Sequence, residues 1–124
     1  MFYEVKKWYP SLKSREKSLP KIYLADHGFL ENGGKAFENV VFLELLRHGK
    51  KVYYIVNGSY EVDFYIPPAT YIQATWNLEE AQSRELRALE KVKGRKCIIV
   101  PYFTDEAVPF FDLDKCFKTL APKK

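Results

Sequence analysis

Two acidic side chains, Glu38 and Asp63, occupy positions where the surrounding pattern of residues predicts contact with a core. Carboxylate oxygens are ligands for divalent cations, and two carboxylates close together could hold one. A carboxylate that is buried without a partner is costly, so a buried pair needs a chemical reason. Whether the two side chains meet depends on the elements that carry them.

Asp63 belongs to a predicted hairpin of two strands, 60–67 and 70–77, joined at Pro67-Pro68-Ala69. Prolines between two apolar runs favour a tight turn. With the turn centred on Pro68, Asp63 lies opposite Gln73 and Glu61 lies opposite Thr75. Strict alternation predicts an apolar face of Val62, Phe64, Ile66, Ile72, Ala74 and Trp76, and an opposite face of Glu61, Asp63, Tyr65, Tyr71, Gln73 and Thr75.

The polar face of this hairpin has two interpretations. An antiparallel sheet often has one face in water, and then the polar side chains need no further explanation. If helices cover both faces, the carboxylate and the amide must be satisfied by partners inside the protein.

Glu38 lies in a predicted helix from 35 to 47, which follows Asn32-Gly33-Gly34 and is closed by Gly49. Its neighbours on the same side of that helix are all apolar: Val41, Phe42, Leu45 and Leu46. An acidic residue in a first turn also interacts favourably with the helix dipole, which is one explanation for it. The other is that the carboxylate points along the stripe facing the sheet and approaches Asp63.

Composition limits the classes of protein that this chain can belong to. Its 124 residues are 47% hydrophobic and 16% aromatic, which suits one folded domain, taken as 1–124 with a lead-in at 1–20 and an extension at 104–124. The sequence has no apolar run long enough for a membrane span and no apolar signal-peptide core near its N-terminus, so we expect a cytoplasmic protein with no membrane partner. Cys97 and Cys116 are expected to be thiols in the core.

The net charge of +4 and the pI near 9.0 permit a nucleic-acid partner without requiring one. Basic residues cluster at 13–17, 47–51 and 91–96. The last two clusters end predicted helices, where cations are favoured by the helix dipole, so charge alone leaves DNA binding open.

The apolar pattern predicts an α/β fold. The expected strands are 2–8, 21–25, 51–56, 60–67, 70–77 and 96–103, and the expected helices are 35–47 and 78–93. Because a strand that follows a crossover helix normally returns parallel to the strand before it, we expect a mixed sheet flanked by helices. The residues from 104 to 120 are expected to form a loop and a short terminal element.

Four motifs in this order carry a resemblance to a known family: Lys21-Ile-Tyr-Leu-Ala-Asp-His-Gly-Phe29, Gly34-Lys-Ala-Phe-Glu-Asn-Val-Val-Phe-Leu-Glu-Leu45, Tyr60-Glu-Val-Asp-Phe64 and Tyr71-Ile-Gln-Ala-Thr-Trp76. Together they resemble the PD-(D/E)XK nuclease superfamily. More narrowly, they resemble the domain of unknown function that follows the P-loop module of many archaeal and bacterial AAA-type ATPases. The resemblance covers Phe2 to about Val100. It implies a restriction-endonuclease-like core: helix, three-stranded meander, helix and strand, with a mixed sheet flanked by helices.

The same resemblance implies roles for individual residues. Glu38, Asp63 and Gln73 correspond to ligands of Mg²⁺ or Mn²⁺, with Gln73 at the third acidic position. Active members carry a lysine two residues later, where this chain has Thr75, and threonine cannot supply the cation. By analogy with the loss of one oxyanion-hole donor, losing that charge would cost roughly 10²–10³ in rate. Lys35 and Arg84 are the candidate substitute cations.

Two functions are compatible with threonine in place of the lysine at position 75. One is a non-catalytic or weakly active module that binds DNA or protein and is an accessory domain of an ATPase-type protein. The other is an active, Mg²⁺-dependent DNA endonuclease in which metal positions the phosphate and activates water. The chain has no G-x-x-x-x-G-K-[ST] motif, so a P-loop ATPase would be a partner in cis or in trans. A second copy, forming a homodimer, is a further candidate partner.

Overall fold

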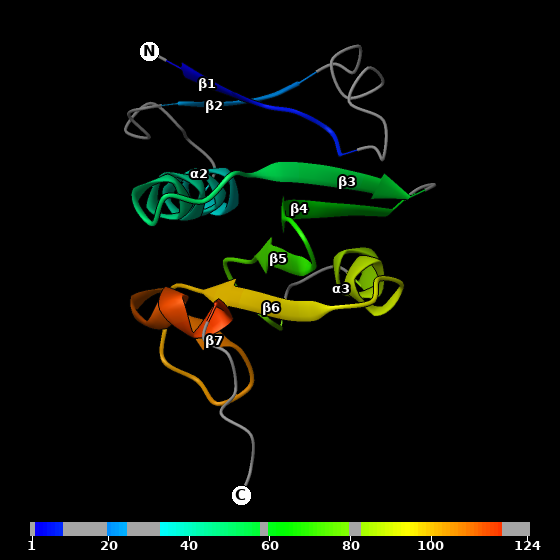
Figure 1. Cartoon of the computed structure of the whole chain (residues 1–124). Helices are drawn as coiled ribbons and strands as arrows, with labels where there is room; N and C mark the ends of the chain where they lie inside the picture. Colours follow the sequence, from blue (N-terminus) through cyan, green and yellow to red (C-terminus); the bar gives the residue numbers. More distant parts are fainter. Residues whose placement is uncertain (1, 9–19, 25–32, 58–59, 80–82, 118–124) are drawn as a thin grey trace, which may run out of the picture.

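The computed structural model describes residues 2–8, 20–24, 33–57, 60–79 and 83–117 (Figure 1). The elements are β1 (Phe2–Val5), β2 (Lys21–Leu24), α2 (Gly33–Arg47), β3 (Tyr53–Asn57), β4 (Tyr60–Ile66), β5 (Thr70–Ala74), α3 (Ser83–Glu90), β6 (Arg95–Val100), β7 (Val108–Pro109) and a 3₁₀ helix, η2 (Phe110–Cys116).

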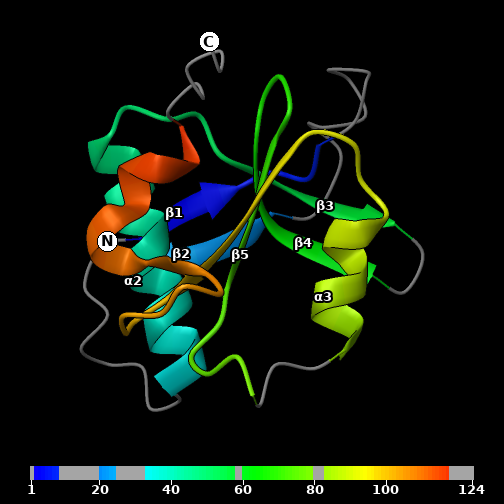
Figure 2. The same cartoon turned by 90° about the horizontal axis from the view of Figure 1, so that it is seen from below.

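Five strands form one mixed sheet in the order β3-β4-β5-β6-β7. The pairs β3–β4 and β4–β5 are antiparallel, whereas β6 returns parallel to β5 and β7 lies parallel to β6. Strands β1 and β2 form a separate antiparallel pair above β3 (Figure 1). Helix α2 and η2 cover one face of the sheet and α3 covers the other (Figure 2). The predicted α/β class, with a mixed sheet flanked by helices, is therefore confirmed.

The larger core cluster lies between α2 and the sheet. The apolar stripe of α2 packs there, with Phe37, Val41, Phe42 and Leu45 all buried. The sheet contributes Phe64, Ile66, Ile72 and Ile99 to the same cluster. Cys97 and Cys116 belong to it as well, and both are buried free cysteines, as predicted.

A smaller cluster joins α3 to the opposite face of the sheet. Ala88 and Leu89 of α3 pack with Val62, and Ile98 lies beside them. Helix α3 contacts β4 and β5, so it covers only part of its face. Part of the sheet surface beside β6 is therefore not covered by α3.

The predicted hairpin register is confirmed next to the turn, because Phe64 pairs with Ile72 and Ile66 pairs with Thr70. The predicted pairs Asp63 with Gln73 and Glu61 with Thr75 lie beyond the paired stretch. The predicted strict alternation along β4 is wrong. The pairing of β3 with β4 shifts between Tyr53↔Tyr65 and Ile55↔Val62, so β4 has one extra residue in that stretch. Val62 consequently packs on the α3 side, although Phe64 and Ile66 pack on the α2 side.

The predicted start of the second helix at 78 is also wrong. Leu78 and Glu79 form a turn, and α3 begins at Ser83. Two hydrogen bonds satisfy the turn: the Leu78 N–H donates to the Tyr102 hydroxyl (2.9 Å), and the Glu79 N–H donates to Asn77 Oδ1 (2.9 Å). Side chains that bond to nearby backbone groups compete with helix formation, which explains the later start.

The expected helix also ends early, at Glu90, and Gly94 makes the turn into β6 with a φ of 144°. A Cβ atom added at Gly94 would lie 2.4 Å from the Ala69 carbonyl oxygen, so only glycine fits this approach.

Candidate functional site

The shift in β4 determines where its acidic side chains lie. The extra residue lies between Val62 and Tyr65 and changes the side on which the preceding part of the strand places its side chains, so Glu61 and Asp63 lie near α2 and β2 instead of facing α3. Strict alternation predicted the opposite face for both. The hypothesis that Glu38 approaches Asp63 requires this local irregularity.

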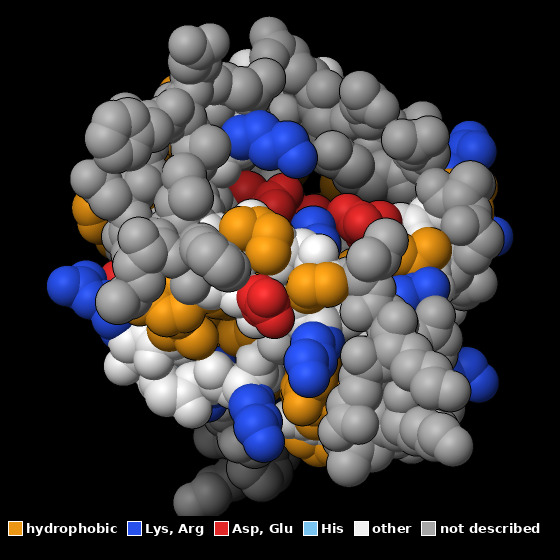
Figure 3. Space-filling view, turned by 90° about the horizontal axis from the view of Figure 1, so that it is seen from above, with side chains coloured by type: hydrophobic (Ala, Val, Ile, Leu, Met, Phe, Trp, Pro, Cys, Tyr) orange, Lys and Arg blue, Asp and Glu red, His pale blue; other side chains and the backbone are white. Residues whose placement is uncertain are grey.

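Four charged side chains meet at this place, and we call them the carboxylate–lysine cluster: Lys21, Glu38, Glu61 and Asp63. Lys21 Nζ lies 3.1 Å from Glu61 Oε2 and 3.6 Å from Glu38 Oε2. The side chains of Lys21 and Glu38 are 21% and 17% exposed, whereas that of Glu61 is 46% exposed. Figure 3 shows acidic side chains on both sides of a basic one near the middle of this face.

The Lys21 ammonium is the cation of this cluster, and it offsets part of the negative charge of the three carboxylates. Burial lowers the pKa of Lys21, but the carboxylates of Glu38, Asp63 and Glu61 outweigh burial, so its pKa is raised above the ordinary value. Lys21 therefore carries its full charge at neutral pH. The electrostatic partner of the carboxylates comes from β2, far from them in sequence.

Tyr23, two residues after Lys21 on β2, fixes the Glu38 carboxylate. Its hydroxyl donates a hydrogen bond of 2.5 Å to Glu38 Oε2. Tyr23 is buried and stacks on Phe42, with ring centroids 4.4 Å apart. Burial and the nearby Glu38 charge both raise the pKa of Tyr23, so its hydroxyl remains a proton donor.

Asp63 lies where its charge is disfavoured. Burial raises the pKa of Asp63 well above the ordinary value, and the Glu38 carboxylate raises it further. The Lys21 charge and the hydrogen bond from the Ala74 N–H to Asp63 Oδ2 (3.0 Å) act in the opposite direction. Asp63 shares its site with two other carboxylates and one ammonium, which accounts for these opposing effects on its pKa.

Gln73 bridges the backbone of β4 with both ends of its amide. Its Oε1 accepts a hydrogen bond from the Asp63 N–H (2.7 Å), and its Nε2 donates to the Glu61 carbonyl oxygen (2.9 Å). The side chain is buried and continues the β4–β5 pairing beyond Phe64↔Ile72. The predicted metal-ligand oxygen is thus already bonded to a backbone N–H.

Thr75 lies inside the protein at the position where active relatives of the resembled family carry lysine. It is 8% exposed, and its N–H donates to the Ile99 carbonyl oxygen (2.9 Å). The hydroxyl donates to the Asn77 carbonyl oxygen at 3.4 Å. Thr75 therefore contributes no charge to the cluster.

The roles of Lys35 and Arg84 as substitutes for the missing lysine remain predictions. Lys35 is exposed on α2, three residues before Glu38. Arg84 belongs to α3, which covers the other face of the sheet, and its side chain lies outside the described part (Figure 2). Two sequence features also lie outside the described residues: the basic cluster at 13–17 and the part of the first motif from 25 onwards.

Sequence reasoning missed Lys21, Tyr23 and Glu61 as members of the site. A weak signal was present, because Lys21 and Tyr23 are two residues apart and so share one face of an otherwise apolar strand. Nothing local indicated that this face meets α2 and β4. The contact between Lys21 and Glu61 joins residues 40 positions apart.

A divalent cation needs several oxygen ligands gathered in one place. No group of three His, Cys, Asp or Glu side chains in the described ranges could hold a metal ion. The carboxylates that would attract a metal ion have the Lys21 ammonium beside them. The Gln73 side-chain oxygen accepts a hydrogen bond from a backbone N–H. The described arrangement is a network of three carboxylates with one ammonium among them.

Comparison with known proteins gives one uncharacterised relative and no family. The chain is 36% identical over 94 residues to the uncharacterised protein MJ1544 of Methanocaldococcus jannaschii. The match covers 65% of this chain and 21% of that protein, so the chain spans about a fifth of its relative's length. No family model and no solved structure matches the chain. In the described part, no helix is long and apolar enough to cross a membrane.

Proposed function

We propose that this chain is a non-cleaving module with a restriction-endonuclease-like core, and that it binds DNA or protein as an accessory domain of an ATPase-type protein. The observation that carries the proposal is the Lys21 ammonium, 3.1 and 3.6 Å from two carboxylates of the cluster. It offsets part of the negative charge at the place where a nuclease of the PD-(D/E)XK type would hold its metal. Thr75 supplies no second cation for a phosphate.

The order of the core elements supports the restriction-endonuclease-like part of the proposal. A helix bearing Glu38 precedes a three-stranded antiparallel meander, and a second helix leads to a strand parallel to β5. This order is the one that the sequence resemblance implies. Fold alone does not give function, so the proposal depends on the state of the site.

The accessory role is supported by the resemblance to domains that follow a P-loop module. The relative from Methanocaldococcus jannaschii is also much longer than the matched region, which fits a module within a larger protein. The ATPase would act in cis or in trans, because this chain lacks the phosphate-binding motif.

The second candidate function is an active, Mg²⁺-dependent DNA endonuclease. It is favoured by the nearness of Glu38 to Asp63, which is close enough to raise the Asp63 pKa. In this case Lys21 would move away from the carboxylates and serve as the cation at the phosphate. Activity would then depend on both Asp63 and Lys21.

Cleavage of supercoiled, linear and branched DNA with Mg²⁺ or Mn²⁺ separates the two candidates. We expect no metal-dependent cutting by the wild type, and the same result for Asp63→Ala. Cutting by the wild type that Asp63→Ala abolishes would refute the non-cleaving proposal. A matched control is Glu79→Ala, which removes an exposed carboxylate outside the cluster.

DNA contact would use the exposed basic corner between α3 and β6, formed by Lys91, Lys93 and Lys96. Lys91 Nζ lies 4.4 Å from the Tyr60 ring centroid, which orients one of these charges. If DNA is the partner, reversing the three charges should abolish salt-dependent binding. The control is Lys6→Glu, an exposed lysine on the lead-in segment.

A further inference from the structure

Two phenylalanine rings lie on the surface at the end of the sheet that carries β7. Phe103 is 77% exposed and Phe111 is 71% exposed, although aromatic side chains of this size usually lie inside. Their rings stack on each other, with centroids 5.5 Å apart and planes inclined by 19°. We call these two residues the Phe103–Phe111 pair.

The pair rests on ordered structure. Phe111 is the second residue of η2, and the preceding Phe110 contacts Phe37 of the core with ring centroids 6.1 Å apart. On the other side, the Tyr102 hydroxyl accepts a hydrogen bond from the Leu78 N–H, and Thr104 Oγ1 accepts one from the Glu106 N–H at 3.2 Å. The exposed rings are therefore held in place.

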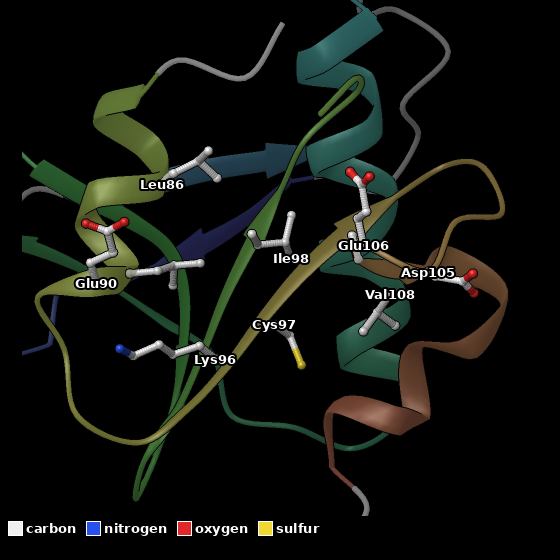
Figure 4. A pocket seen from close by; sticks show the side chains of 10 residues that line it. Leu86, Glu90, Lys96, Cys97, Ile98, Asp105, Glu106 and Val108 are labelled. Carbon is white, nitrogen blue, oxygen red and sulfur yellow. The ribbon is translucent and has the colours of Figure 1, made fainter. Parts of the chain in front are cut away.

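Phe103 lines a hollow of about 500 Å³, and a second hollow of about 590 Å³ lies next to that one. Asp105, Ala107 and Val108 line both of them. Figure 4 shows the larger hollow, where Leu86 of α3 and Ile98 of β6 lie between Glu90 on one side and Glu106 on the other. This hollow lies beside α3, where the helix leaves β6 uncovered.

The charge of this region is opposite to that of the whole chain. Residues 101–117 contain four carboxylates and one lysine, in a chain whose net charge is +4. The carboxylates belong to Asp105, Glu106, Asp112 and Asp114, and the lysine is Lys115, which lies 3.4 Å from Asp112. Glu90 and Lys96 also line the larger hollow. The excess of carboxylates is therefore that of residues 101–117, which disfavour phosphates and attract cations.

We infer that this surface binds a segment of another protein that carries apolar side chains together with arginine or lysine. An apolar side chain of the partner would enter a hollow beside Val108. A guanidinium would stack on an exposed phenylalanine ring next to Asp105 or Asp112, combining a cation–π contact with an ion pair. The inference rests on the proposed function in treating the chain as a binding module, and it names the chemistry of one partner.

Charge argues against a second copy of this chain as the occupant. A two-fold pairing through this surface would place the same acidic residues against each other, and like charges in an interface are unfavourable. A head-to-tail pairing would leave the same surface open on the next copy, and it would continue into a filament or close into a ring.

The experiment measures the binding of two labelled peptides by fluorescence anisotropy. Both are helical, with leucine and tryptophan at the same positions, and their remaining positions carry either arginine or glutamate. The wild type should bind the arginine peptide only, and added salt should weaken binding. Phe103→Ala with Phe111→Ala should weaken it at least about tenfold, as should Asp105→Asn with Asp112→Asn. Ile22→Ala, an exposed apolar residue on β2, should change nothing.

The inference would be overturned by equal binding of both peptides, by unchanged binding of the Phe103–Phe111 variant, or by direct binding of a labelled DNA duplex that this variant loses. Self-association in analytical ultracentrifugation that the Phe103–Phe111 variant loses would identify a second copy instead, and would overturn it as well. None of these outcomes depends on DNA cleavage. The inference can therefore fail while the non-cleaving function stands, and cleavage can be found without affecting the peptide result.

Discussion

The carboxylate–lysine cluster and the Phe103–Phe111 pair lie toward opposite ends of the sheet, and they differ in how their side chains are satisfied. In the cluster, each described charge has a partner inside the molecule: Lys21 lies between acidic groups, and Asp63 accepts a backbone N–H. In the pair, two large apolar rings are exposed, and their ring contacts within the described part of the chain are with each other and with Phe110.

This difference separates a region organised for stability from one organised for contact. The cluster resembles a nuclease centre in its residue types, but its interactions are internal. The pair has no catalytic residue types, but it exposes the apolar surface that interfaces use. Breaking the first region should therefore alter the free energy of unfolding, and breaking the second should alter binding.

The largest effect is expected for Gln73→Ala. The amide satisfies the Asp63 N–H and the Glu61 carbonyl oxygen, and the truncated side chain leaves both without that partner in a buried place. The free energy of unfolding, measured by urea denaturation, should fall by roughly 2–4 kcal/mol. Gln73→Glu keeps the acceptor but loses the donor and adds a charge beside Asp63. A loss below about 0.5 kcal/mol for Gln73→Ala would show that the bridge is dispensable.

Lys21→Met should have the next largest effect. It keeps the length of the side chain but leaves Glu38, Glu61 and Asp63 without their cation. Because Lys21 is partly exposed, the loss should lie between those of exposed and buried ion pairs, at about 1–3 kcal/mol. Millimolar Mn²⁺ should restore part of this stability in the variant and change nothing in the wild type.

The matched control for this prediction is Lys96→Met, which changes an exposed lysine on β6. Equal losses for both lysine variants would mean that the position of Lys21 has no special role. Stabilisation of the wild type by Mn²⁺ would show that the cluster accepts a metal while Lys21 is present, and would favour the endonuclease.

A smaller effect of opposite sign is expected for Asp63→Asn. The folded-state pKa of Asp63 is raised, so the folded protein holds this proton more tightly than the unfolded chain. Stability should therefore fall as pH rises from the ordinary carboxyl range through the folded-state pKa of Asp63. The asparagine still accepts the Ala74 N–H and has no charge to bury, so the variant should equal or exceed the wild type by up to about 1 kcal/mol at pH 7.

The measurement for Asp63→Asn is the free energy of unfolding between pH 4 and pH 8. The pH dependence should be flatter in the variant than in the wild type. A steeper decline in the variant, or a clear loss of stability at pH 7, would show that the ionised carboxylate stabilises the fold.

The sequence predicted the arrangement of the sheet because local signals set it. The Pro67-Pro68-Ala69 turn fixed the pairing of Phe64 with Ile72, and the apolar stripe around Leu45 identified the buried face of α2. The parallel return of β6 followed from the crossover helix. Each of these features depends on residues near one another in the chain or on a general rule of connection.

The site was less predictable because its geometry depends on distant contacts. The extra residue in β4 has no marker in the sequence around Asp63, yet it decides which face receives Glu61 and Asp63. Lys21 reaches the cluster from β2, and nothing in its own segment indicates carboxylate partners. The start of α3 was misjudged because a turn held by Asn77 and Tyr102 replaced its first residues.

The smallest effect on stability should come from the double change Phe103→Ala with Phe111→Ala. Both rings are more than two-thirds exposed and contact mainly each other, so their removal takes little apolar area out of the protein. The free energy of unfolding should stay within about 0.5 kcal/mol of the wild type, whereas binding of the arginine peptide should weaken at least about tenfold. A large loss of stability would show that the two rings stabilise the fold. The pair would then no longer differ from the carboxylate–lysine cluster in this respect. Unchanged stability with lost binding would separate the two regions: one maintains the fold, and the other recognises a partner.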